Sequence, residues 1–164
     1  MKYIFLLIVI LVSKITIFSQ TSGSGYMKLN SECLGTEMDG SLTLKSWGSG
    51  RNYSDALEQA KKNAVYEVIF KGIKEGDNSC SRSALLVEVN AEKKHEEYFA
   101  QFFSDNGPYK EFVSLKDERI GHKFKRDKKR RDVTITESAV VRVQRLLIKK
   151  KLVRDNIMIN YIEQ

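Results

Sequence analysis

Histidine and cysteine are the residue types most able to act as bases, nucleophiles or metal ligands near neutral pH, and the chain has two of each. His95 is followed by two glutamates, and His122 lies between a glycine and a lysine. Neither histidine has a serine or cysteine nucleophile beside it, and no glycine-rich phosphate-binding loop is present. The adjacent Asp117 and Glu118 would point to opposite faces of a strand, which makes them a poor acid–base pair. The sequence predicts no catalytic site and no cofactor.

Lysine and arginine side chains form a second chemically active group, because they bind anions. Residues 119–154 hold 14 basic and 3 acidic side chains, a net charge of +11, whereas residues 20–118 hold 12 basic and 16 acidic ones, a net charge of −4. Such asymmetry favours an anionic partner. The alternative is a solubilising loop whose charges face water. The candidate anion-binding residues crowd one arm and its tip: Lys123, Lys125, Arg126, Lys128, Lys129, Arg130 and Arg131.

Residues 1–19 have the pattern of a cleaved signal peptide. Lys2 precedes an unbroken apolar run from Tyr3 to Val12, which is shorter than the ~20 residues that a helix needs to cross a bilayer. We expect cleavage near residue 19 or 20, with an uncleaved anchor as the alternative. The residues before Cys33 do not fit a lipid-attachment site. The sequence therefore predicts an exported protein, periplasmic or extracellular, that is not lipidated and has no transmembrane segment in its mature part.

Cys33 and Cys80 both lie in the mature part. Two cysteines in an oxidising compartment predict a disulfide, and two unpaired thiols are the alternative. A zinc site built from both cysteines with His95 and His122 is disfavoured, because no CxxC or HxxxH spacing brings ligands together locally. We expect no bound metal.

The remaining pattern predicts one α+β domain over residues 41–156, after a flexible leader and a poorly placed segment at 20–40 and before a tail at 157–164. Alternating apolar residues predict a sheet of about four strands, mixed or antiparallel, with a long C-terminal hairpin. Two main helices and a short C-terminal helix would cover one face of this sheet in a two-layer arrangement. The expected order is strand 41–47, helix 54–71, strand 84–89, helix 91–105, two strands between 115 and 144, and a helix from 146 to about 155.

Four aromatic residues fall on one side of the expected helix 91–105. Such a stripe is typical of core packing, and a ligand groove is the alternative. The residues are Tyr98, Phe99, Phe102 and Phe103.

The stretch SWGSGRNYSDALEQAKKNAVYEVIFKGI resembles the N-terminal domain of the flagellar T protein and related small outer-membrane lipoproteins of Gram-negative bacteria. The resemblance rests on Gly48, Gly50, Ala56, Ala60 and Ala64. Because these are packing residues, it implies a fold and no activity, and the chain departs from those lipoproteins in lacking their lipid-attachment cysteine.

Three further segments, DALEQAKKNAVYEVIFKGI, EVNAEKKHEEYFAQFF and FVSLKDERIG, resemble a group of uncharacterised exported single-domain proteins from Bacteroides-like bacteria. This resemblance spans most of the mature chain. The group has no known activity that could be transferred.

These observations predict a non-enzymatic exported cell-envelope protein that acts as a binding or accessory assembly module. Its partner would be another envelope protein or an anionic surface polymer. The alternative is a binder of anionic ligands, such as lipopolysaccharide phosphates, an anionic glycan or nucleic acid, through the basic hairpin 119–131. An enzyme would need His95 or His122 in a concave pocket with a polar partner.

Overall fold

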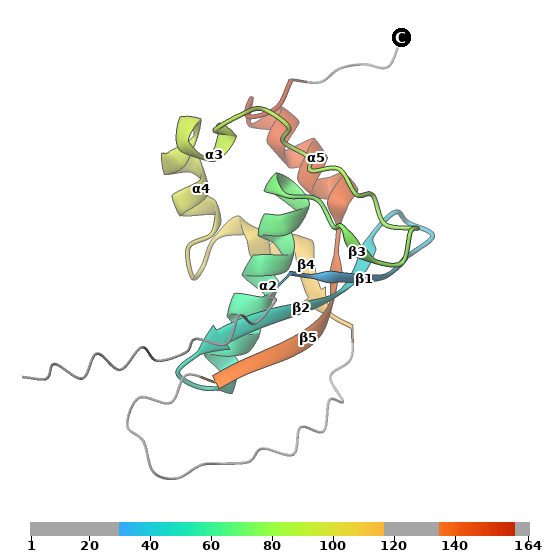
Figure 1. Cartoon of the computed structure of the whole chain (residues 1–164). Coiled ribbons are helices and arrows are strands. Elements are labelled where there is room, and N and C mark those ends of the chain that lie inside the picture. The colour runs from blue at the N-terminus through green and yellow to red at the C-terminus, as the bar shows by residue number, and fades with distance from the viewer. Residues whose placement is uncertain (1–29, 117–134, 160–164) are drawn as a thin grey trace, which may run out of the picture.

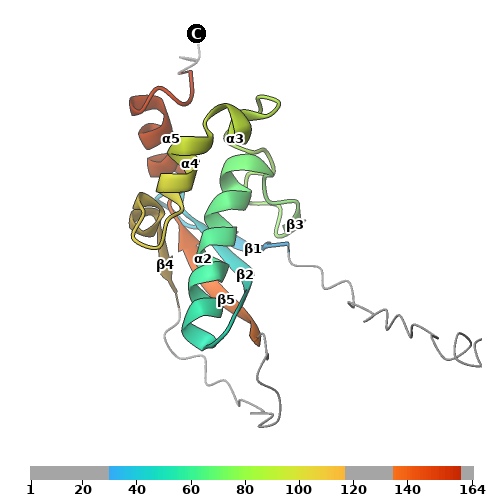
Figure 2. The same cartoon turned by 90° about the vertical axis from the view of Figure 1, so that its left-hand side faces the viewer.

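The computed structural model describes residues 30–116 and 135–159. They form an α+β domain whose five-stranded mixed sheet has the strand order β3-β1-β2-β5-β4. Helix α2 (Tyr53–Phe70) crosses one face of this sheet, and α5 (Arg145–Arg154) follows the last strand (Figures 1 and 2). The predicted fold class is confirmed, with one strand more than expected.

Two long strands form the centre of the sheet. β2 (Leu42–Gly50) and β5 (Ile135–Val143) pair antiparallel along all nine residues of each. Successive side chains point to opposite faces, so Leu44 and Val141 are fully buried while Trp47 lies on the opposite, partly exposed face. The alternation expected in this part of the sequence is confirmed.

Three short strands complete the sheet. β1 (Glu32–Thr36) pairs antiparallel with β2, β3 (Glu75–Gly76) pairs parallel with β1, and β4 (Val113–Leu115) pairs antiparallel with β5. β1 lies inside the interval 20–40, which the sequence pattern left as leader and poorly placed segment. The described part of the domain therefore includes residues 30–40, which lie before the expected boundary at 41.

The start of the domain is held by a buried carboxylate. The backbone N–H of Ser31 donates to Glu67 Oε2 of α2 at 2.7 Å, and the Ser31 hydroxyl lies 2.9 Å from that of Ser46 on β2. All three side chains are almost completely buried. Burial of a charged group requires such partners. These contacts hold Ser31, at the start of the described domain, against α2 and β2.

Helix α2 packs closely on the sheet because small residues line its inner face. Asn52 caps its N-terminus by accepting from Asp55 N at 2.9 Å, so the capping residue lies two positions before Ser54, the start expected from the sequence. A Cβ at Gly48 of β2 would lie 2.1 Å from a backbone oxygen of the helix, so the strand backbone touches the helix there. The helix residues on this face are fully buried: Ala56, Ala60 and Ala64.

The segment 84–89 is not a strand, and this prediction is wrong. Leu85 and Leu86 are buried, and their backbone N–H groups donate to the carbonyls of Val68 and Ile69 at 3.1 and 2.9 Å. These carbonyls belong to the last turn of α2, where the C=O groups have no N–H partner within the helix. The apolar run therefore caps a helix instead of pairing with a strand.

The helix expected over 91–105 is two short helices. α3 (Ala91–Lys94) and α4 (Glu96–Phe102) are separated by His95, whose φ of −119° and ψ of 36° are not helical. A 3-10 helix (Pro108–Phe112) then leads into β4. No helix within 30–116 or 135–159 is long and apolar enough to cross a bilayer.

The C-terminal part agrees in part with the expected order: β4 and β5 are antiparallel neighbours and α5 follows as predicted, but β4 has only three residues and ends at Leu115. Most of the first long strand expected after 115 lies outside the described residues. The expected signal peptide 1–19, the charged arm between the two strands and the end of the tail lie outside the described residues.

Candidate functional site

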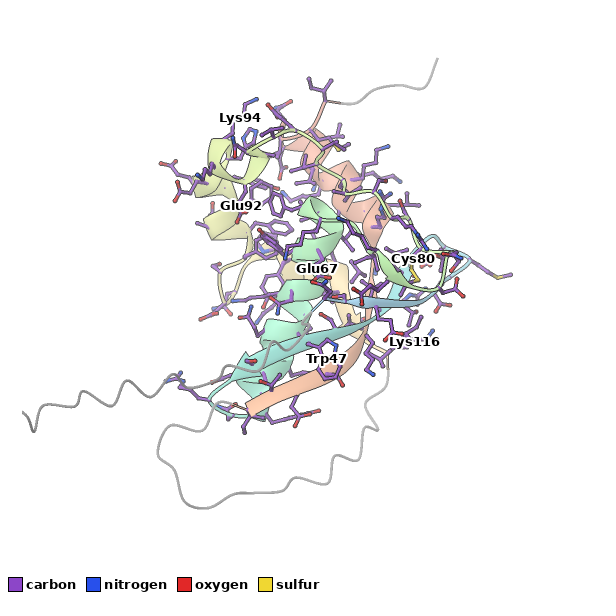
Figure 3. The ribbon with its side chains drawn as sticks, in the orientation of Figure 1. Trp47, Glu67, Cys80, Glu92, Lys94 and Lys116 are labelled. Atoms are coloured by element: carbon purple, nitrogen blue, oxygen red, sulfur yellow. A yellow bond between two sulfur atoms is a disulfide. The ribbon has the colours of Figure 1, made fainter. Side chains whose placement is uncertain are left out.

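The disulfide Cys33–Cys80 is present, as the sequence predicted. It joins β1 to the loop after β3, with a Cα–Cα distance of 6.1 Å and both residues buried (Figure 3). Asp77 N donates to Cys33 O at 2.9 Å, and Thr36 Oγ1 donates to Ser79 O at 2.8 Å. These hydrogen bonds join β1 to the loop that holds Cys80, on either side of the disulfide. Both sulfurs are consumed by the bridge, and within the described part of the chain no cluster of three potential metal ligands exists.

His95, one of the two histidines considered as a base, is half-buried at the junction of α3 and α4. The shallow hollow around it is lined by charged neighbours, namely Lys93, Lys94, Glu96 and Glu97, together with Tyr98. A nucleophilic mechanism needs a Ser or Cys within hydrogen-bond reach of such a base. In the described ranges neither a serine nor a cysteine lines this hollow, and His122 lies outside those ranges.

The predicted anion-binding residues, Lys123 to Arg131, also lie outside the described residues, but both ends of their segment are anchored in the sheet. Residues 117–134 leave β4 after Lys116 and return into β5 at Ile135. Lys116 N donates to Val140 O at 3.0 Å, which extends the β4–β5 ladder by one residue. The sheet thus holds the two ends of the basic segment on neighbouring strands.

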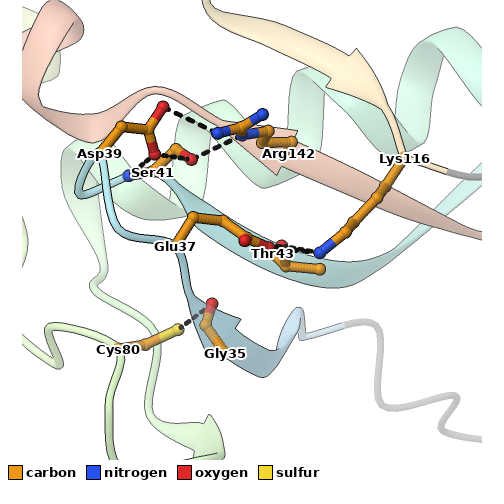
Figure 4. A network of polar contacts seen from close by, with 8 residues as sticks. All are labelled: Gly35, Glu37, Asp39, Ser41, Thr43, Cys80, Lys116 and Arg142. Atoms are coloured by element: carbon orange, nitrogen blue, oxygen red, sulfur yellow. Dashed lines mark hydrogen bonds and ion pairs between the residues drawn. The ribbon is translucent and has the colours of Figure 1, made fainter.

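A polar network fixes the β4 end of this segment (Figure 4). The Lys116 ammonium pairs with Glu37 and lies 3.2 Å from Thr43 Oγ1, and the Thr43 hydroxyl donates to Glu37 Oε1 at 2.7 Å. The hydrogen bond with Lys116 holds the pKa of the Glu37 carboxyl below its ordinary value. The cation nearest the segment is therefore neutralised by the turn between β1 and β2.

The same turn also pairs with the guanidinium of Arg142 on β5. Arg142 donates through Nε to Ser41 Oγ at 2.7 Å and through a terminal nitrogen to Asp39 Oδ2 at 2.8 Å. Hydrogen bonds from the Ser41 hydroxyl and backbone, with a further one from Arg142, lower the pKa of Asp39 to about 2. Lys116 and Arg142 are therefore both paired with acidic side chains of this turn.

This network was missed at the sequence level because its members are far apart in the chain. The signal for its turn was present, however. Asp39-Gly40 between two short apolar runs is a strong hairpin motif, and Gly40 has a φ of +76° that favours glycine. The motif could have placed β1 and β2 as a hairpin.

The aromatic stripe packs in and against the core, as its pattern favoured. Phe99 and Phe102 are buried in the core, while Tyr98 and Phe103 pack against it and remain partly exposed. Phe99 and Phe103 also form the floor of an open hollow of about 350 Å³ between α2 and α4. Its polar rim consists of Gln59, Lys62, Asn63, Glu92 and Glu96, with Tyr66 beside them.

Three tyrosines donate hydrogen bonds to carboxylates around this layer. The pairs are Tyr66–Glu92 at 2.8 Å, Tyr98–Asp155 at 2.7 Å and Tyr109–Glu58 at 3.0 Å. Burial and then the carboxylate raise the pKa of each phenol, that of Tyr66 to about 12. The bonds join α2 to α3 and to the 3-10 helix, and α4 to the end of α5.

These bonds predict a loss of stability at alkaline pH. The folded-state pKa of the phenols lies above the unfolded value of about 10, so their stabilisation is complete below about pH 10 and disappears as the pH rises towards about 12. We expect the tyrosinate absorbance of the native protein to rise later than that of the urea-unfolded chain. In Y66F, Y98F and Y109F together, this delay should largely vanish; coincident titrations of native and unfolded wild type would contradict the prediction.

Comparison of the whole chain with protein families, with curated proteins and with solved structures finds no match.

Proposed function

We propose that this protein is an exported binding module of the cell envelope that acts by holding a partner and performs no reaction of its own. The observation that carries the proposal is the buried Cys33–Cys80 bridge in a chain that begins with a signal-like apolar run. Stable disulfides are typical of oxidising compartments. The described domain suits a binding role, because the Cys33–Cys80 disulfide and the close contact between α2 and the sheet make it a rigid support for surface segments.

Export is tested by fractionation. We expect the protein in the periplasmic or extracellular fraction, with a mature N-terminus near residue 19 or 20. A crosslinked pull-down from envelope extract at low salt should recover a defined partner. Intact, unprocessed protein in the cytoplasm would contradict export, and a pull-down without any partner would contradict the binding role.

A second candidate function is direct binding of anionic ligands by residues 119–131. This segment holds eight basic residues and one acidic residue, a net charge of +7. The observation that favours it is that Lys116, the last described residue before the segment, and Arg142 of β5 are already paired with Glu37 and Asp39. The cations that bind an anion would then be those of the segment itself, and they would suit phosphates of lipopolysaccharide.

Charge reversal tests this second function. The variant K128E/K129E/R130E/R131E should bind immobilised lipopolysaccharide about tenfold or more weakly, with a shallower salt dependence, because fewer counterions are released. The matched control R51E/K74E/K93E/K94E makes the same change in net charge at four exposed positions of the described domain. Equal binding by the two variants would contradict the assignment.

A further inference from the structure

Helix α5 has an unusual solvent face. Ile148 and Leu152 are fully buried and hold the helix on the core, but Leu146 and Leu147 remain 49 % and 46 % exposed. Half of its ten residues are basic and none is acidic. The basic residues are Arg145, Lys149, Lys150, Lys151 and Arg154.

Three of these cations have no acidic partner within the described residues, and one of them, Arg145, donates to the backbone oxygen of Ser83 at 3.3 Å. Lys151 pairs with Asp155, and Arg154 Nε lies 4.0 Å from the same carboxylate. Lys149 and Lys150 are exposed, and within residues 30–116 and 135–159 no ion pair or hydrogen bond engages either ammonium. Their positive charge is therefore open to an external anion.

The apolar and basic groups share one surface. At 100° per residue, Lys149 and Lys150 lie one turn from Leu146 on the side of α5 away from Ile148. The turn between β1 and β2 approaches the same place, because a Cβ at Gly40 would lie 2.8 Å from Leu146 Cδ1. Met38 in that turn is fully exposed. In Figure 2, α5 forms the upper left edge of the molecule.

We infer that this face of α5 binds an anionic lipid surface. A helix that mixes free lysines with exposed leucines suits the membrane interface, where ammonium groups meet lipid phosphates and leucines enter the boundary of the acyl chains. The helix is about 15 Å long, which fits a position in the plane of the interface. The inference uses no residue of the segment 119–131.

Vesicle sedimentation tests this inference on the full mature chain. Wild type should bind vesicles of phosphatidylglycerol with phosphatidylcholine, release at high salt, and bind phosphatidylcholine alone weakly. K149E/K150E should bind the anionic vesicles about tenfold or more weakly, since each lysine near such a surface contributes to the attraction. L146S/L147S should bind more weakly while keeping the salt dependence.

The matched control R51E/K74E changes the net charge as K149E/K150E does. Arg51 lies in the turn between β2 and α2, at the opposite end of the domain from α5 in Figure 1, and this control should change binding less than about twofold. Circular dichroism and the fluorescence of Trp47 check that each variant is folded. Equal losses in K149E/K150E and the control would overturn the inference, as would wild type that fails to bind anionic vesicles. Loss of vesicle binding in K128E/K129E/R130E/R131E with full binding by K149E/K150E would assign the lipid contact to the basic segment and overturn it too.

Discussion

Removal of the Cys33–Cys80 bridge by C33S/C80S is expected to lower the free energy of unfolding by about 4 kcal/mol, because the bridge closes a loop with a sequence separation of 47 and restricts the unfolded chain. For a domain with a total stability of about 5–15 kcal/mol, this loss is large. It should be measured by urea unfolding at neutral pH. Dithiothreitol should give wild type the same midpoint as the variant.

The local consequence should be greatest around β3. This strand has two residues and pairs only with β1, so the bridge supplies much of what holds the loop at residues 77–84. Hydrogen exchange should report faster opening there than in β2 or β5. The control is dithiothreitol added to C33S/C80S, which should change nothing. If dithiothreitol lowered the free energy of unfolding of wild type by less than about 1 kcal/mol, the chain-entropy argument would fail for this loop.

Substitution of Gly48 by alanine is expected to destabilise the domain by about 3 kcal/mol or more. The added Cβ would lie 2.1 Å from Ala56 O and 2.3 Å from Ala60 N. Both are backbone atoms of a helix that is already in contact with the strand, so no side-chain rotation relieves the clash. The helix must move away from β2, which weakens the contacts of its buried alanines.

The neighbouring residue offers the control. Ser49 points to the opposite face of the sheet, where its hydroxyl lies 2.8 Å from Thr136 Oγ1. S49A removes that hydrogen bond without crowding α2 and should cost about 1 kcal/mol. Thermal and urea unfolding of both variants give the comparison. If G48A were no less stable than S49A, the close contact between strand and helix would not be essential.

Elements with a strong period could be predicted from the sequence, and elements formed by tertiary contacts could not. The alanines at every fourth position of α2 and the alternation in β2 match the structure, because each pattern is set by the element's own geometry. The run at 84–89 has no period that separates a buried strand from a buried cap. Its role depends on the carbonyls of Val68 and Ile69, which have no N–H partner within α2 and accept from Leu85 and Leu86. The local pattern does not reveal this contact.

β1 escaped prediction for a different reason. Its pairing with β2 shifts register between Cys33 and Gly35, and a bulge interrupts the alternation by which strands are recognised. In the candidate site, too, features of the local sequence could be predicted and tertiary contacts could not. The charge of residues 119–131 can be counted from the sequence, but the neutralisation of Lys116 and Arg142 required the fold. Glu37 is 79 residues from Lys116, and Asp39 is 103 residues from Arg142.

The position of the disulfide also determines how the domain responds to tension. Cys33 is the second residue of β1, an inner strand of the sheet. A force applied at the two chain ends therefore passes through the sulfur–sulfur bond almost as soon as it enters the fold. The bridge bypasses residues 34–79, so these residues are not stretched when the oxidised chain is pulled out under force. The fully extended oxidised protein is therefore much shorter than the fully extended reduced protein.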